Sequence, residues 1–105
     1  MLRIYDVMLE LVREVAPVVG EIERRDPDLA RQCRRALSSG PLNVAEGSYS
    51  QGRNRNARYH TAMGSLREAL ACFELGAALD YTRPLDAGAR DKFDRSIATL
   101  FKLVR

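Results

Sequence analysis

The chain has 105 residues, of which 46% are hydrophobic and 30% are charged, and its formal net charge at pH 7 is +3. This composition excludes a disordered chain, and the length suits one domain, residues 1–105, whose small core needs help from a partner chain. No apolar run is long enough to span a membrane, and recurring acids interrupt any signal-peptide core at the start, so we expect a cytoplasmic protein with no membrane contact.

The first predicted helix runs from Leu2 to Ile22 and carries two adjacent apolar stripes, which together are wider than one neighbouring helix covers. Pro17 lies inside this pattern and predicts a kink. A second helix begins at Asp26-Pro27, where an acid can cap the helix and proline suits its first position. The helical spacing resumes directly after Gly40-Pro41, so we predict a kinked second helix that continues until Gly47–Gly52.

The segment Gly52–Asn56 is polar and predicts a turn, in which Asn54 or Asn56 caps a third helix over Ala57–Asp80. That helix repeats a small residue every seven positions, which would let another backbone approach closely. The repeat consists of Ala57, Gly64, Ala71 and Ala78. A fourth helix begins at Pro84 or Asp86.

Four helices with short connections and no strand pattern predict an all-α fold, an antiparallel four-helix bundle with up-down-up-down topology. The wide face of the first helix and the small residues of the third offer more apolar surface than one subunit buries. We therefore expect a homo-oligomer.

The two cysteines, Cys33 and Cys72, fall at apolar helix positions with no further cysteine or histidine at metal-ligand spacing. Cysteines of this kind in a cytosolic protein are reduced core residues. We expect neither a disulfide nor a metal site, and no cofactor motif is recognisable.

The strongest functional signal is a concentration of arginine between residues 31 and 60, where Glu46 is the single acid. Guanidinium groups bind phosphates, and aromatic rings between them can stack on unpaired bases, so this segment suits RNA or DNA. A solvated turn with surface arginines is the alternative. The candidate residues are Arg31, Arg34, Arg35, Arg53, Arg55 and Arg58, interleaved with Tyr49, Tyr59 and His60.

A second hypothesis is a metal-independent ribonuclease that uses Arg55 and His60. Arginine followed after four residues by histidine resembles the motif of helical ribonucleases of defence systems, in which the two side chains assist attack by a ribose 2′-hydroxyl. Arginine makes up about one residue in seven of this chain, so the spacing also arises by chance. Glu46, beside the Pro41 kink, is expected to have a structural role, bonding freed backbone groups or an arginine such as Arg67.

Two longer strings, residues 34–52 and 64–81, resemble the bacterial four-helix bundle proteins encoded within intervening sequences of 23S ribosomal RNA genes. The accessory variability protein of diversity-generating retroelements is similar. The matching pattern is Arg34, Arg35 and Ala36, then Pro41, Asn43, Ala45, Glu46 and Gly47, then Gly64, Ser65, Leu66 and Glu68, and a closing Tyr81.

The resemblance implies a homopentameric barrel of four-helix subunits with a basic surface, nucleic-acid binding and, in the retroelement branch, contact with a reverse transcriptase. It also marks Pro41, Asn43, Glu46, Gly47 and Gly64 as structural positions. We therefore predict a non-enzymatic, oligomeric accessory protein that binds RNA or DNA. The ribonuclease and a purely structural protein–protein scaffold remain the alternatives.

Overall fold

Four α-helices make up residues 3–104, the part of the chain that the computed structural model describes. They are α1 (Arg3–Arg25), α2 (Pro27–Ser48), α3 (Gly52–Ala78) and α4 (Ala87–Leu103), and there is no strand among these residues. The all-α prediction is confirmed. The expected start of the first helix, Leu2, lies outside the described residues.

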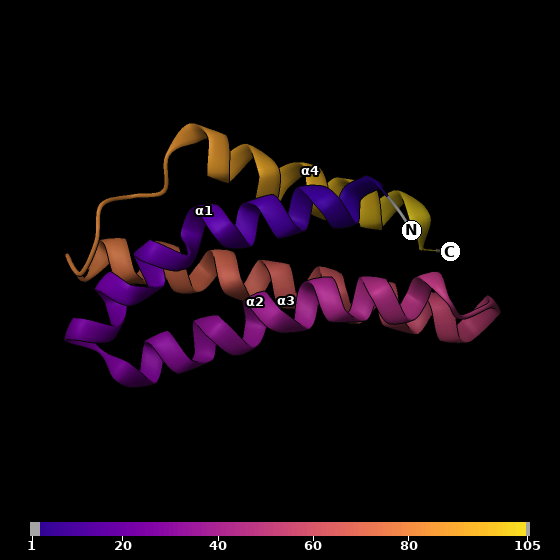
Figure 1. Ribbon diagram of the computed structural model, residues 1–105, viewed down its shortest axis with the longest axis horizontal. Helices are drawn as coiled ribbons and strands as arrows, with labels where there is room; N and C mark the ends of the chain where they lie inside the picture. The colour runs from indigo at the N-terminus through magenta and orange to yellow at the C-terminus, as the bar shows by residue number, and fades with distance from the viewer. Residues whose placement is uncertain (1–2, 105) are drawn as a thin grey trace.

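The helices form an antiparallel bundle in which α1 and α4 lie on one side and α2 and α3 on the other (Figure 1). Each helix packs against its two neighbours, so α1 and α3 both contact α2 and α4. The bundle is elongated, with extents of 42 × 25 × 19 Å. This is the up-down-up-down arrangement that short connections enforce.

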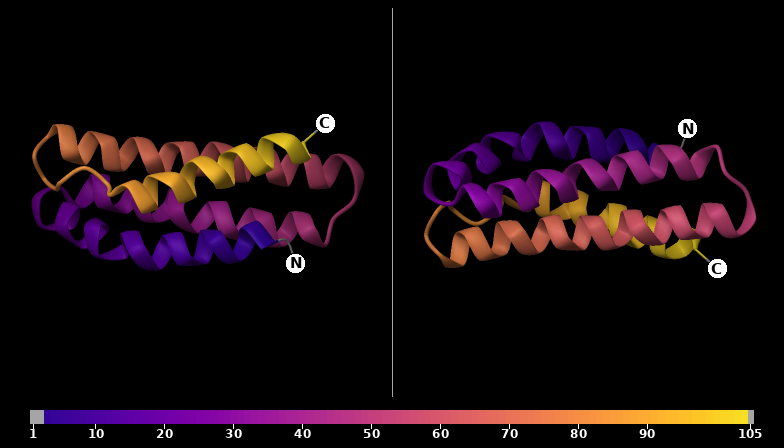
Figure 2. Two further views of the ribbon diagram at one scale, coloured as in Figure 1. Left: turned by 90° about the horizontal axis from the view of Figure 1, so that it is seen from above. Right: turned by 90° about the horizontal axis from the view of Figure 1, so that it is seen from below.

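The hairpin of α2 and α3 is longer than the rest of the bundle. Figure 2 shows that the α2–α3 turn extends past the start of α1 and the end of α4. We call residues 47–60 the hairpin tip, which comprises the end of α2, the turn and the start of α3. Within the tip only Gly47 and Tyr59 are buried, so most of its side chains are in water.

The second helix begins and continues as its sequence predicts. Asp26 caps it, with its Oδ1 accepting a hydrogen bond from the backbone N–H of Leu29 at 3.0 Å. The helix then runs without interruption through Pro41, which is buried. Proline has no N–H to donate to the carbonyl of Leu37, so the helix tolerates one unmade backbone bond at this point.

The third helix begins five residues earlier than predicted, at Gly52 instead of Ala57. Gly52 adopts a φ of +58°, which a residue without a Cβ reaches at little cost, and this reverses the chain within a very short connection. The following arginines, good helix formers, are then already helical. Neither Asn54 nor Asn56 caps the helix; the N-cap is Gln51, whose side chain makes no capping hydrogen bond.

The third helix ends at Ala78, two residues before the expected Asp80, because Asp80 has a left-handed φ of 60°. The N–H of Tyr81 then bonds the carbonyl of Gly76 at 2.9 Å, as in the Schellman motif. The Tyr81 ring lies 5.6 Å from the Arg25 guanidinium, and its hydroxyl donates to Asp26 at 3.4 Å. This closing tyrosine therefore ties the end of α3 to the turn between α1 and α2.

The core runs along the bundle axis and draws large side chains from all four helices. At its centre Phe73 of α3 and Phe93 of α4 pack with ring centroids 6.1 Å apart. Cys33 and Cys72 are buried and free, as predicted, and burial raises the pKa of Cys33 to about 12. The other large, fully buried residues are Met8, Leu11, Val15, Val19, Ile22, Val44, Leu66 and Leu100.

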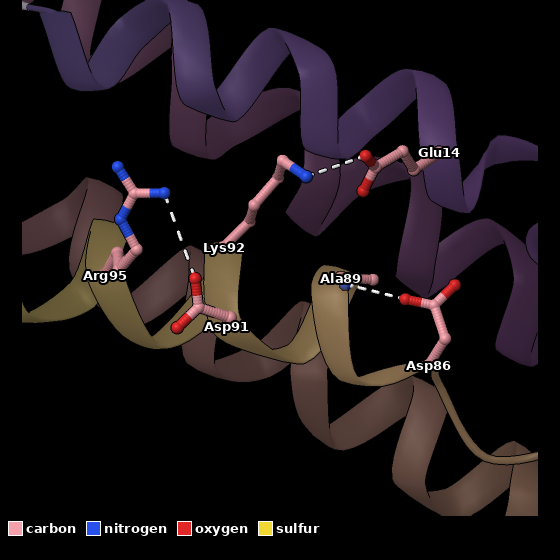
Figure 3. Close-up of polar contacts among 6 residues, drawn as sticks. All are labelled: Glu14, Asp86, Ala89, Asp91, Lys92 and Arg95. Carbon is pink, nitrogen blue, oxygen red and sulfur yellow. Dashed lines mark hydrogen bonds and ion pairs between the residues drawn. The ribbon is translucent and has the colours of Figure 1, made fainter.

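Polar contacts fix α4 against α1 (Figure 3). The Nζ of Lys92 donates to Oε1 of Glu14 at 2.7 Å, and this bond raises the pKa of the lysine. At the start of α4, Oδ1 of Asp86 accepts a hydrogen bond from the N–H of Ala89 at 2.8 Å, so Asp86 is the N-cap. Of the two predicted starting residues, Asp86 is therefore the one that caps the fourth helix.

The repeated small residues of α3 do not pack inside the subunit. A Cβ added to Gly64 would meet no atom within 4 Å, and this glycine is exposed. The other three members of the repeat, Ala57, Ala71 and Ala78, are exposed as well. The core face of α3 instead combines bulky residues such as Met63, Leu66 and Phe73 with a different set of small ones, Ala62, Ala69 and Gly76.

Within residues 3–104, none of the helices combines the length and the apolar composition needed to cross a lipid bilayer.

Candidate nucleic-acid interface

The hairpin tip carries three of the predicted arginines, Arg53, Arg55 and Arg58, which are spread around the axis of the first two turns of α3. All three are exposed, and none of them forms an ion pair with another described residue. The surrounding segment, residues 47–67, contains four arginines and one histidine but no acid. The tip is therefore a concentrated positive surface that protrudes from the bundle.

Two of these arginines are oriented by hydrogen bonds, Arg55 by the α2–α3 turn and Arg58 by α2. The Nε of Arg55 donates to the carbonyl oxygen of Ser50 at 3.1 Å. The Nη1 of Arg58 donates to Oδ1 of Asn43 at 3.4 Å, and the amide of Asn43 donates in turn to the Ser39 carbonyl at 2.9 Å. These bonds use one donor from each guanidinium and leave the rest available.

A groove on the α2–α3 surface ends at the hairpin tip. Its lining includes the exposed Tyr49, the C-cap residue of α2, together with Arg58. A second hollow continues along α2 towards Arg35, sharing Leu42 and Asn43 with the first. The exposed α2–α3 face is thus hollowed from Arg35 to the tip.

Arg31 and Arg34 lie nearer the opposite end of α2, where Arg34 lines the second hollow beside Arg35, and both are paired with acids. Arg31 contacts Asp28 at 3.0 Å, and Arg34 contacts Glu23 at 2.7 Å. The hydrogen bond and the charge of Arg34 lower the pKa of Glu23. Of the predicted arginines on α2, only Arg35 therefore has no ion pair among the described residues.

Tyr59 is not a base-stacking residue, contrary to the sequence prediction. It is only 3% exposed because its ring is seated on Gly47, where an added Cβ would lie 2.5 Å from Tyr59 Cε1. Tyr59 lies four residues before Met63 and seven before Leu66, so all three share the buried face of α3. Gly47 is accordingly a structural residue, since any side chain at this position would collide with the Tyr59 ring.

Glu46 has no structural bonding role within the subunit. Its side chain is exposed, lines the groove and accepts no hydrogen bond from Arg67 or from backbone groups among residues 3–104. The neighbouring Asn43, by contrast, does have the expected structural role. Its amide nitrogen donates to both the carbonyl and the hydroxyl of Ser39, and Ser65 of α3 donates to the same hydroxyl at 2.8 Å.

Arg55 and His60 are not brought together by the fold. Both are exposed on one continuous helix, five residues apart, which separates their directions by about 140° around the axis. Neither residue lines the groove or the second hollow of the α2–α3 face. The geometry therefore gives no support to a ribonuclease site within one subunit.

No group of three or more His, Cys, Asp or Glu side chains within residues 3–104 is arranged to hold a metal ion. Comparison with protein-family models, with curated proteins and with solved structures finds no match for this chain. The resemblance to the ribosomal intervening-sequence proteins stays a prediction.

Proposed function

We propose that this protein is a non-enzymatic, oligomeric helical protein that binds the phosphate backbone of RNA or DNA through the hairpin tip. Arg53, Arg55 and Arg58 supply the main contacts. Binding of this kind depends on charge, so it weakens steeply with salt and has little sequence preference of its own.

The observation that carries this proposal is the position of the three arginines at the start of α3. The N-terminus of a helix has a partial positive charge, so the cations of the first turn, Arg53 and Arg55, lower stability by about 0.3–1 kcal/mol each at low salt. No acid in the first turn offsets them, and no side chain caps the free backbone N–H groups. A phosphate at this place would neutralise the guanidinium groups and accept hydrogen bonds from the N–H groups.

Oligomerisation would extend the basic surface beyond one subunit. The predicted homopentamer can bring Arg35 and the paired Arg31 and Arg34 of one subunit near the tip of another. The exposed apolar side chains Leu75, Leu79 and Phe101 support association between chains. A reverse transcriptase is the protein partner that the retroelement resemblance adds to this proposal, and co-purification of the two proteins would test it.

Light scattering and RNA titration test the proposal together. A pentamer has a mass of about 59 kDa, five times the chain mass of 11.8 kDa. A labelled single-stranded RNA should bind, and the slope of log K against log salt should become shallower by about 2 units when Arg53, Arg55 and Arg58 are all changed to alanine, at about 0.7 per lost contact.

A control variant removes the same charge elsewhere. Arg13, Arg24 and Arg83 are exposed and lie outside the tip, and their triple alanine variant lowers the net charge equally. It should retain most of the affinity. Equal loss in both variants would show that only net charge matters, and no affinity for RNA or DNA at low salt would overturn the proposal in favour of a protein scaffold. Cleavage that His60→Ala abolishes would favour the ribonuclease.

A further inference from the structure

The groove beside the hairpin tip combines three groups of different chemistry on a short stretch of surface. Its lining contains the ring of Tyr49, the carboxylate of Glu46 and the guanidinium of Arg58, with Leu42, Asn43 and Ala45 between them. Residues 42, 45, 46 and 49 follow the i, i+3, i+4, i+7 spacing, so they share one face of α2. Arg58 reaches this face from α3.

Tyr49 is an aromatic ring left almost wholly in water, with 85% of the residue exposed. Its backbone is nevertheless fixed, because it is the C-cap of α2: its N–H donates to the carbonyl of Glu46, and the N–H of Ser50 donates to the carbonyl of Gly47. Its hydroxyl makes no hydrogen bond with a described residue. A fixed backbone with a free ring is a suitable platform for stacking, and it carries little ordering cost on binding.

Glu46 is the exception in this positive surface. A lone carboxylate would repel a phosphate backbone, and Glu46 has no partner within the subunit that would neutralise it. An ionised carboxylate only accepts hydrogen bonds, and it can take two parallel ones. The Watson–Crick edge of guanine presents two adjacent donors, N1–H and the 2-amino group, whereas that of uracil presents one N–H between two carbonyl oxygens. Glu46 therefore complements guanine and is poorly suited to uracil.

Arg58 is the phosphate-binding member of the groove. Its bond to Asn43 uses one N–H, and Asn43 is itself held by Ser39. The remaining guanidinium donors can contact a phosphate next to the bound base. Arg58 thus links the groove to the charged tip.

We propose that this groove binds an unpaired guanine nucleotide of a single-stranded nucleic acid, with the base stacked on Tyr49, its donor edge on Glu46 and its phosphate on Arg58. This inference rests on the proposed function and adds a preference for single strands and for guanine. A duplex cannot satisfy it, since stacking covers both faces of each guanine and pairing occupies its donor edge.

The test uses fluorescence anisotropy with labelled 12-nucleotide RNAs at fixed moderate salt. One is all uridine, a second has a single central guanosine, and the third is the second annealed to its complement. The wild-type protein should bind the guanosine strand at least about five-fold more tightly than the other two, the lower end of what one bidentate base contact supplies. Light scattering on each variant checks that the mass of the oligomer is unchanged.

Matched variants test the stacking on Tyr49 and the hydrogen bonds to Glu46 separately. Tyr49→Ala should weaken binding of the guanosine strand about five-fold or more, while Tyr49→Phe keeps the affinity because stacking needs only the ring. Glu46→Gln should abolish the preference for guanosine over uridine without lowering affinity for the uridine strand.

The outcomes distinguish this inference from the proposed function. If all three RNAs bind equally, with salt-dependent affinity that needs Arg53 and Arg55, the inference is overturned while the proposed function stands. The same holds if Tyr49→Ala or Glu46→Gln leaves the guanosine preference unchanged. A change of oligomer mass in Tyr49→Ala would assign the groove to a neighbouring subunit and would also overturn it. If no RNA binds at all, both proposals fail.

Discussion

The contact between Gly47 and Tyr59 leads to a prediction whose sign can be worked out from distances. In Gly47→Ala the new Cβ would lie 2.5 Å from Tyr59 Cε1, 2.8 Å from Cδ1 and 3.2 Å from Arg58 Cβ. The Tyr59 ring is only 3% exposed and cannot swing into solvent without losing its burial. Overpacking of this kind costs about 1–3 kcal/mol.

Part of this cost is offset because alanine is a better helix former than glycine, by about 0.5–1 kcal/mol in a helix interior. Position 47 is the penultimate residue of α2, where that gain is smaller. The net expectation is a loss of about 1–2 kcal/mol. In a domain of this size, such a loss lowers Tm by roughly 5–15 °C.

Gly64→Ala is the matched control. It makes the same chemical change in the interior of α3, where the added Cβ would meet nothing within 4 Å. Only the helix-propensity gain remains, so this variant should be more stable by about 0.5–1 kcal/mol. Urea unfolding followed by circular dichroism at 222 nm measures both variants, with light scattering to record the oligomeric state.

Stabilisation by Gly47→Ala would refute the packing argument, because it would mean that the ring moves aside at no cost. Destabilisation by Gly64→Ala would refute the expectation that its surroundings are open. If that loss came with dissociation of the oligomer, the small-residue face of α3 would be identified as a contact between subunits.

Three further variants test separate features. Burial raises the pKa of Cys33 from 9.0 to about 12, so between these pH values the folded chain keeps a proton that the unfolded chain releases. The unfolding free energy therefore falls as pH rises from about 9 to 12, by up to ~1.4 kcal/mol per pH unit. The Cys33→Ala variant should have a shallower pH dependence in urea unfolding. The Ser96 hydroxyl is buried without a hydrogen-bond partner among the described residues, so Ser96→Ala should raise the unfolding free energy by about 1 kcal/mol, and an unchanged or lower value would reveal an unrecognised partner. Arg53→Glu should raise the unfolding free energy through the helix dipole, by about 1 kcal/mol at low salt, while weakening RNA binding more than Arg53→Ala does; a lower unfolding free energy would show that Arg53 has a stabilising partner.

The helices could be predicted from the sequence because their signals are local. The acid–proline start at Asp26 and the return of helical spacing after Pro41 each depend on neighbouring residues alone. The start of α3 was misplaced because Asn54 and Asn56 are good capping residues, while Gly52 was not recognised as the residue that reverses the chain. A glycine in a sequence permits a positive φ, but whether it adopts one depends on the other residues of the turn.

The candidate site was predicted in part, and its errors have a common cause. The sequence identifies which residues are basic or aromatic, but the face of the helix decides what each one contacts. Tyr49 and Tyr59 looked equivalent beside the arginines, yet one is an exposed cap residue and the other fills the space over Gly47. The groove beside Glu46 was not predicted, since it requires the register between α2 and α3 that the contact between Asn43 and Arg58 reveals.

The hairpin tip departs from the rules that stabilise helices elsewhere in this chain. The starts of α2 and α4 are capped by Asp26 and Asp86, whose carboxylates satisfy backbone N–H groups and suit the positive helix end. The start of α3 has an uncapped Gln51 followed by arginines. The capping rule is followed at the starts of α2 and α4 and broken at the start of α3. The resulting loss of stability is therefore confined to the hairpin tip. An anionic ligand removes that cost, because it supplies the negative charge and the hydrogen-bond acceptors that the sequence omits there.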